Sequence, residues 1–152
     1  MMHPFNSPAE QYRRTVASLW PLCCALLLLL TPLSAQAWYN NSWTYRVPIS
    51  VPAGSAVNST IKVDVDFAAL LTTLGAAGTF DANSPRVVRS NDTTLSTTQE
   101  FTDTVYAGAT DAVGNGRGEI RFLLEDAGPV TYYLYFDVTA NGPKAVNPQT
   151  PI

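Results

Sequence analysis

The side chains of this sequence that could do acid–base chemistry are nearly all carboxylates. Asp64 and Asp66 lie two residues apart in the stretch STIKVDVDF. On an extended strand they would project from one face with their Cα atoms roughly 6.5 to 7 Å apart, a spacing compatible with the paired acids of a glycoside hydrolase. Lys62 shares that face, however, and alternating charges are typical of the solvated side of a strand. We therefore predict no catalytic residue in the chain.

Calcium is the one cofactor for which the sequence offers ligands, because Ca²⁺ binds oxygen atoms. Residues 111–119 (DAVGNGRGE) place Asp111, Asn115 and Glu119 in a glycine-rich stretch. A calcium loop also needs an oxygen ligand at its third position, and Val113 stands there. We predict an ordinary turn and no metal site, with calcium left open as the alternative.

Histidine and cysteine are confined to the beginning of the chain. The single histidine is His3, and the two cysteines are Cys23 and Cys24. A product that begins after residue 37 therefore has no catalytic triad with histidine, no cysteine nucleophile, no zinc site of histidine or cysteine and no disulfide.

Residues 1–37 have the pattern of an export signal. Arg13 and Arg14 supply a basic start, residues 19–30 (LWPLCCALLLLL) are apolar, and Ala35-Gln36-Ala37 matches the small-x-small cleavage pattern. We predict a signal peptide over 1–37, cleavage after Ala37, and a product that is secreted or held in the periplasm or at the cell surface. The alternative is an uncleaved membrane anchor over residues 16–33, which is about long enough to span a bilayer.

The predicted product, residues 38–152, is acidic and long enough for one domain. It holds seven basic and eleven acidic residues, a net charge of −4, because Arg13, Arg14 and Glu10 lie in the first 37 residues. Nucleic-acid binding requires a concentrated basic surface, which this composition does not supply.

Alternation of apolar and polar side chains predicts strands over most of this product. The expected strands cover residues 42–51, 59–67, 86–89, 97–102, 119–125 and 130–138. We expect the last two, which Gly128-Pro129 separates, to form a hairpin. Residues 107–118, with four glycines, are expected to be the longest loop and the least ordered segment.

One short helix interrupts the strands. Phe67, Leu70, Leu71 and Leu74 have helical spacing, Asp66 can cap the helix at its N-terminus, and Gly75 can end it. The sequence thus predicts a mostly antiparallel, jelly-roll-like β-sandwich with one short helix over residues 38–140, followed by a linker-like tail over 141–152.

The last predicted strand carries the candidate ligand-binding residues. Tyr133 and Tyr135 share its polar face, where two neighbouring exposed rings, together with Trp38, could stack on a sugar. The same tyrosines could instead lie under a loop or against a neighbouring domain. Tyrosine is also simply a good strand former.

A set of short motifs spread over residues 38–144 resembles a known family. The motifs are Trp43, Tyr45, Arg46, Pro48 and Ile49; Phe80-Asp81; Arg86-Val87-Val88; Gly118 with the strand after it; and the run from Tyr132 to Asp137. The chain resembles a domain of unknown function in exported bacterial and archaeal surface proteins, including proteins similar to the MSHA-pilus biogenesis protein Q. The resemblance implies an extracytoplasmic β-sandwich without catalytic residues. Such proteins usually continue into another module, so the chain is expected to be a fragment of a longer protein or a module that acts alone.

We therefore predict an exported, non-catalytic surface module that acts in adhesion or in pilus-type or cell-envelope assembly. Its partners would be other cell-surface or pilus proteins, or glycans. The alternative is a carbohydrate-binding module of a polysaccharide-degrading system, with Tyr133, Tyr135 and Trp38 as the stacking residues. A hydrolase that depends on Asp64 is a third and weaker alternative.

Overall fold

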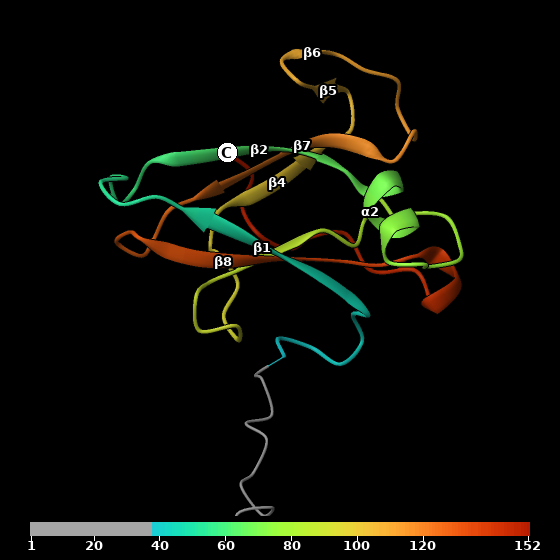
Figure 1. The fold of residues 1–152 in the computed structure, drawn as a ribbon, viewed down its shortest axis with the longest axis horizontal. Helices are drawn as coiled ribbons and strands as arrows, with labels where there is room; N and C mark the ends of the chain where they lie inside the picture. Colours follow the sequence, from blue (N-terminus) through green and yellow to red (C-terminus); the bar gives the residue numbers. More distant parts are fainter. Residues whose placement is uncertain (1–37) are drawn as a thin grey trace, which may run out of the picture. The chain divides into compact units, whose positions relative to one another are not determined.

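The computed structural model describes residues 38–152, and the predicted signal peptide lies outside the described residues. Two three-stranded antiparallel sheets face each other (Figure 1). The first sheet has the order β1 (Tyr45–Val51), β8 (Val130–Phe136), β3 (Arg86–Val88), and the second the order β2 (Thr60–Asp66), β7 (Arg117–Leu123), β4 (Gln99–Thr102). The predicted antiparallel β architecture with one short helix is confirmed, and two facing sheets are consistent with a β-sandwich.

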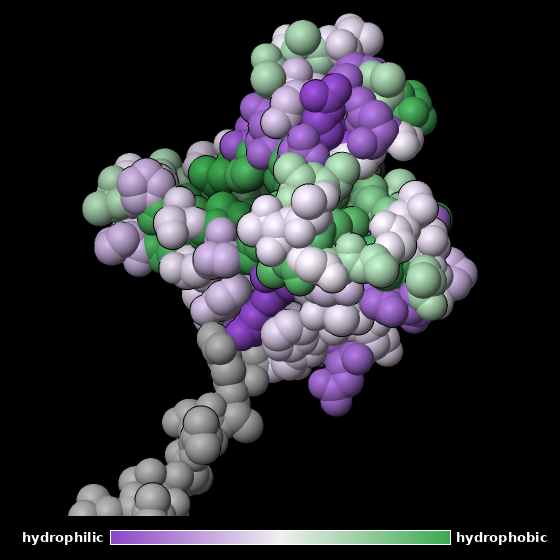
Figure 2. All heavy atoms as spheres, turned by 45° about the vertical axis from the view of Figure 1, so that its right-hand side comes forward, coloured by the Kyte–Doolittle hydropathy of each residue, from purple (hydrophilic) through white to green (hydrophobic). Residues whose placement is uncertain are grey.

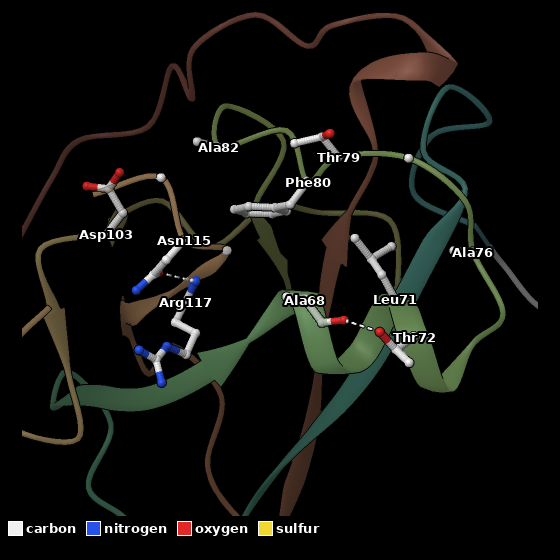
Figure 3. A pocket seen from close by; sticks show the side chains of 13 residues that line it. Ala68, Leu71, Thr72, Ala76, Thr79, Phe80, Ala82, Asp103, Asn115 and Arg117 are labelled. Carbon is white, nitrogen blue, oxygen red and sulfur yellow. Dashed lines mark hydrogen bonds between the residues drawn. The ribbon is translucent and has the colours of Figure 1, made fainter. Parts of the chain in front are cut away.

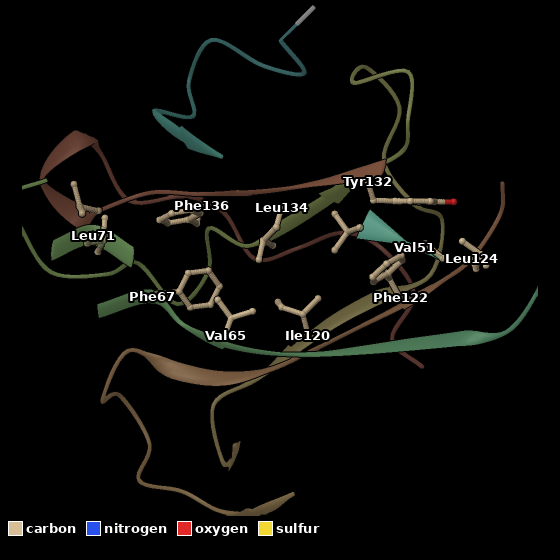
Figure 4. Close-up of a cluster of buried hydrophobic side chains, with 12 residues drawn as sticks. Val51, Val65, Phe67, Leu71, Ile120, Phe122, Leu124, Tyr132, Leu134 and Phe136 are labelled. Atoms are coloured by element: carbon tan, nitrogen blue, oxygen red, sulfur yellow. The ribbon is translucent and has the colours of Figure 1, made fainter. Parts of the chain in front are cut away.

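The apolar core fills the space between the sheets because the inward side of each long strand carries large hydrophobic side chains. Leu134 and Phe136 point inward from β8 and Ile120 and Phe122 from β7 (Figure 4). The rings of Phe122 and Tyr132 lie 5.0 Å apart across the interior. Each such side chain contributes about 1.5–3 kcal/mol to folding when it is fully buried, so this core can hold the domain together without a disulfide.

The expected hairpin between the last two strands does not form. β7 pairs with β2 and β4, whereas β8 pairs with β1 and β3, so consecutive strands lie in different sheets. The alternation pattern is the same in both arrangements. The six residues between β7 and β8 span the roughly 10 Å between packed sheets, and the inward faces of the two strands then meet across the core.

The helix α2 (Phe67–Thr73) follows β2 directly, as the sequence predicts. The Asp66 carboxylate accepts a hydrogen bond from the backbone N–H of Ala69 at 2.8 Å and so caps the first turn. Gly75 lies just beyond the helix at φ 65°, a backbone conformation that glycine adopts without strain. Phe67 and Leu71 are buried, so the helix closes one end of the core.

The stretch expected to be the longest loop contains part of a small hairpin. β5 (Val105–Tyr106) pairs with β6 (Ala109–Thr110), and the turn between them has positive φ at both Ala107 and Gly108. That is the geometry of a tight two-residue hairpin turn. Two strands of two residues each are too short for an alternation pattern to show, which explains why the sequence indicated only a loop.

The segment over 141–152, expected to be linker-like, starts at the last residue of the short helical turn η1 (Thr139–Asn141) and lies against the domain. Lys144 donates its backbone N–H to Asp81 at 2.6 Å, and Arg86 donates to the carbonyl of Ala145 at 2.7 Å. Further on, Gln99 donates its backbone N–H to the carbonyl of Thr150 at 2.9 Å. Over residues 38–152 no helix has the length and hydropathy needed to cross a membrane.

Candidate functional site

The predicted stacking residues lie on the outer face of the first sheet, but they do not form an exposed platform. Trp38 and Tyr133 are half-buried, whereas Tyr135 has an exposed fraction of 0%. Trp38 packs edge-on against Tyr135 with 5.1 Å between ring centroids, and Tyr39 does so at 5.8 Å. The expectation that Tyr135 is exposed is therefore wrong, because the residues that precede β1 cover it.

Arg46 fastens this covering segment to the sheet. Its guanidinium carbon lies 4.5 Å from the centre of the Trp38 ring and 4.9 Å from that of Tyr133, within the range of cation–π attraction. Arg46 also forms an ion pair with Asp92, which accepts a 2.7 Å hydrogen bond from the hydroxyl of Tyr135. The three predicted stacking residues thus share one structural cluster with Arg46.

A second polar cluster lies around Asp137 at the end of β8. Asp137 is fully buried and accepts hydrogen bonds from Asn141 at 2.7 Å and from the backbone N–H of Val138 at 2.9 Å; the ammonium of Lys144 lies 3.0 Å from the carboxylate. Burial alone would raise the pKa of Asp137, but these three partners outweigh it and hold the pKa below its ordinary value. Sequence reasoning missed this residue, although these three partners follow it within seven positions, because alternation along the strand placed it on the polar face and gave no sign that it is buried.

The acidic residues considered for catalysis have separate structural roles. Asp66 caps α2, and the exposed Asp64 accepts a hydrogen bond from the backbone N–H of Ala107 at 2.9 Å. Neither forms an ion pair with another side chain of residues 38–152. Among residues 38–152, no group of three or more His, Cys, Asp or Glu side chains could hold a metal ion.

The glycine-rich stretch considered for calcium is occupied by protein partners. Asn115 donates to one oxygen of Asp111 at 2.9 Å, and Arg117 donates to the other at 3.1 Å. The bond from Asn115 is the main cause that lowers the pKa of Asp111. Glu119 pairs instead with Arg121, so it does not join Asp111 at a shared site.

A cavity of about 320 Å³ lies between α2 and the glycine-rich stretch (Figure 3). Phe80 lines it and stacks on the buried Phe67 at 4.2 Å between ring centroids. Asp103 also lines it, and its carboxylate forms no hydrogen bond or ion pair with any residue of 38–152. The cavity therefore combines an aromatic surface with an acidic group, and the polar side chains of Thr72, Asn115 and Arg117 also line it.

A largely apolar groove lies on the side of the sandwich where β1 and β2 are the edge strands. It has a volume of about 410 Å³ and is lined by Val47 and Ile49 of β1, Val63 of β2, Leu70 of α2 and Leu134 beneath them. Hydrophobic side chains gather in a hollow beside α2 in Figure 2. Asp64 and Asp66 stand on its rim.

The opposite side of the sandwich is sealed by polar groups. The buried Gln99 side chain accepts the backbone N–H of Val87 at 2.6 Å and donates to the carbonyls of Val87 and Ser96 at 2.9 and 2.7 Å. It thus bonds to the edge of β3 as another strand would. The backbone of β4 meets Thr150 at the same side. Of the two sides formed by strand edges, the β1–β2 side is the one where residues 38–152 leave apolar surface between the sheets open.

No protein-family model matches the chain, and no curated protein and no solved structure matches it significantly.

Proposed function

We propose that the chain is an exported, non-catalytic surface module that acts in adhesion or in pilus-type or cell-envelope assembly by contacting other proteins. The observation that carries this proposal is the apolar groove between β1, β2 and α2. Large contiguous apolar patches are uncommon on monomeric domains and mark sites of protein contact.

The contrast between the two sides of the sandwich supports this choice. Val47, Ile49 and Val63 are only half-buried, although they point between the sheets. A partner that covers them gains about 25 cal/mol for each Å² of apolar surface removed from water. Export and a jelly-roll-like sandwich stay predictions, which the resemblance to surface-protein domains supports.

A pair of neighbouring substitutions tests the proposal. Ile49→Glu places a charge in the groove, whereas Ser50→Glu places the same charge on the exposed face of the same strand. Each variant is returned to a source strain that lacks the gene, and attachment of the cells to a surface and shedding of envelope proteins are measured. We expect Ile49→Glu alone to reduce attachment or assembly at least threefold. Equal phenotypes at equal surface levels of folded protein would refute the proposal.

One specific observation favours the carbohydrate-binding alternative: Phe80 and Asp103 line the same cavity. Sugars stack on aromatic rings and hydrogen-bond to carboxylates. A glycan array with the wild type, Tyr133→Ala and Asp103→Ala separates the possibilities. Binding lost in Tyr133→Ala supports the outer face, binding lost in Asp103→Ala supports the cavity, and no binding to any glycan supports protein contact.

A further inference from the structure

The four edges of the two sheets differ in how well they are protected against pairing with another strand. An unprotected edge is a template for strand addition, and folded proteins normally block it. The side chain of Gln99 occupies the edge of β3, and the backbone around Thr150 lies against that of β4. The two remaining edges, β1 and β2, both border the apolar groove.

The edge of β1 is blocked by a proline. On β3, the backbone N–H and carbonyl of Val87 point to Gln99 and therefore away from β8. Leu134 of β8 lies opposite Val87, so the backbone N–H and carbonyl of Leu134 point to the other side, towards Val47 of β1. Because backbone direction alternates along a strand, Pro48 faces outward. It has no N–H to offer, so the middle of this edge cannot donate a hydrogen bond.

The edge of β2 has no such block. At the end of β7, the backbone N–H of Leu123 donates to Thr98, on the β4 side, and that of Leu124 donates to Ser59, on the β2 side. Because these directions alternate along β7, Ile120 forms its backbone hydrogen bonds with Val63 of β2. The backbone N–H and carbonyl groups of the neighbouring Lys62 and Asp64 therefore point away from β7, towards the free edge of the sheet. Both residues are exposed, and β2 contains no proline.

The charges of β2 are poorly matched within the molecule. Lys62 lies directly opposite Arg121 on β7, and Asp64 lies directly opposite Glu119. Like charges in such positions destabilise a sheet. Arg121 and Glu119 satisfy each other, and neither Lys62 nor Asp64 forms an ion pair with any residue of 38–152. Asp64 accepts a hydrogen bond from the backbone N–H of Ala107, and an added strand with the reversed charge order would supply an opposite charge to both Lys62 and Asp64.

We propose that this strand is β2 of a second copy of the chain, paired antiparallel about a two-fold axis through Val63. This register sets Lys62 opposite the partner's Asp64, and Asp64 opposite the partner's Lys62. If the two-fold axis passed through Lys62 instead, Lys62 would lie opposite the partner's Lys62, and if it passed through Asp64, Asp64 would lie opposite the partner's Asp64. Charge therefore selects one register, which is self-complementary as two-fold symmetry requires.

The same register also matches the inner face of the strand. Val63 meets the partner's Val63 on the axis, and Ile61 meets the partner's Val65, so apolar side chains continue across the junction. The second sheets of the two copies then join at β2 into one six-stranded sheet. The β1-β8-β3 sheet of each copy packs on the same face of this joint sheet, so the two apolar grooves face each other. The inference rests on the proposed function, because it names the protein that covers the groove.

Charge reversal gives a test that depends on this register. The full chain is expressed with its own N-terminal segment, and the exported product is studied by sedimentation equilibrium at low salt. We expect wild type to dimerise, and Lys62→Asp or Asp64→Lys alone to weaken dimerisation at least tenfold, because each change creates two pairs of like charges. A mixture of the two variants restores opposite charges at both positions and should recover a mixed dimer. Wild type that stays monomeric at about 100 µM, or a mixture that stays monomeric, would overturn the inference.

A covalent trap checks the position of the axis. Val63→Cys would bring two thiols together at a non-hydrogen-bonded pair, where the Cβ atoms lie roughly 4.5–5.5 Å apart. We expect oxidation to yield a dimer linked at residue 63, identified by mass spectrometry of the linked peptide. Ile61→Cys, on the same strand and face, should give at least tenfold less linked dimer; equal linkage would overturn the register.

The outcomes also separate this inference from the proposed function. If wild type is monomeric but Ile49→Glu still reduces attachment, the groove binds another protein and the second copy is not its occupant. A dimer that tolerates Ile49→Glu in the cell would support the inference and reject the role of the groove in attachment.

Discussion

Replacement of Gln99 by methionine should destabilise the domain, because the buried Gln99 side chain bonds to three backbone groups. Methionine has nearly the same length but can neither accept nor donate these hydrogen bonds. The N–H of Val87 and the carbonyl of Ser96 both bond to Gln99 and would be left without it, whereas the carbonyl of Val87 keeps the N–H of Ser96 at 2.9 Å.

Two buried groups therefore lose their partner. Each unsatisfied buried group costs about 1–3 kcal/mol, so the free energy of unfolding should fall by about 2–6 kcal/mol. A domain of this size has about 5–15 kcal/mol in total, and a loss of about 3 kcal/mol would lower the melting temperature by roughly 10 °C. The loss should also weaken the tail, since Asn147 donates to the same Gln99 oxygen at 3.2 Å.

Urea unfolding followed by the fluorescence of Trp38 and Trp43 measures this change. Gln149→Met is the matched control, because it makes the same replacement in the tail, where no hydrogen bond of the Gln149 side chain to residues 38–152 is seen. The control should stay within about 0.5 kcal/mol of wild type. If Gln99→Met also stays within that range, Gln99 does not seal the edge of β3 and the contrast between the two sides of the sandwich loses its basis.

Three further predictions concern other parts of the fold. Gly118→Ala should cost about 3 kcal/mol of unfolding free energy in urea titration, because the new Cβ would lie 2.4 Å from the carbonyl oxygen of Thr102; a cost below 1 kcal/mol (roughly the lower limit for overpacking) would contradict the packing of β4 on β7. Asp137→Asn should destabilise the domain most above pH 3.8, the ordinary pKa, and the difference from wild type should close as the pH falls through the lowered folded-state pKa; a difference that grows in acid would give the shift the opposite sign. Arg46→Met should release the segment at Trp38, so that chymotrypsin cuts there at least fivefold faster, and an unchanged rate would mean that Arg46 does not fasten it.

The elements of this fold could be predicted from the sequence because each depends on neighbours in the chain. The alternation around Ile120 and Leu134 indicated which side chains point inward, and Asp66 with Gly75 marked the ends of the helix. The partners of those strands could not be predicted in the same way. The alternation of β7 and β8 is identical whether they pair with each other or face each other across the core, so only the three-dimensional order of the strands corrected the hairpin.

The candidate stacking site shows the same limit at a single residue. Tyr135 alternates with Leu134 and Phe136 and therefore lies on the outer face, as expected. Outer-face position implies exposure only if nothing covers the sheet, and here Trp38 and Tyr39 do. These residues come almost 100 positions earlier in the chain, so no local pattern could indicate the contact.

The alternating charges of β2 have a different meaning on an edge strand than on a central strand. Lys62 and Asp64 alternate with valines, which in a central strand would describe only a solvated face. In the structure the backbone groups of these two residues face outward, and each side chain lies opposite a like charge on β7. In a central strand, a neighbour on the second side could relieve that mismatch within the chain. At an edge, a strand of another molecule can supply the opposite charges, and the order of Lys62 and Asp64 allows that molecule to be a second copy.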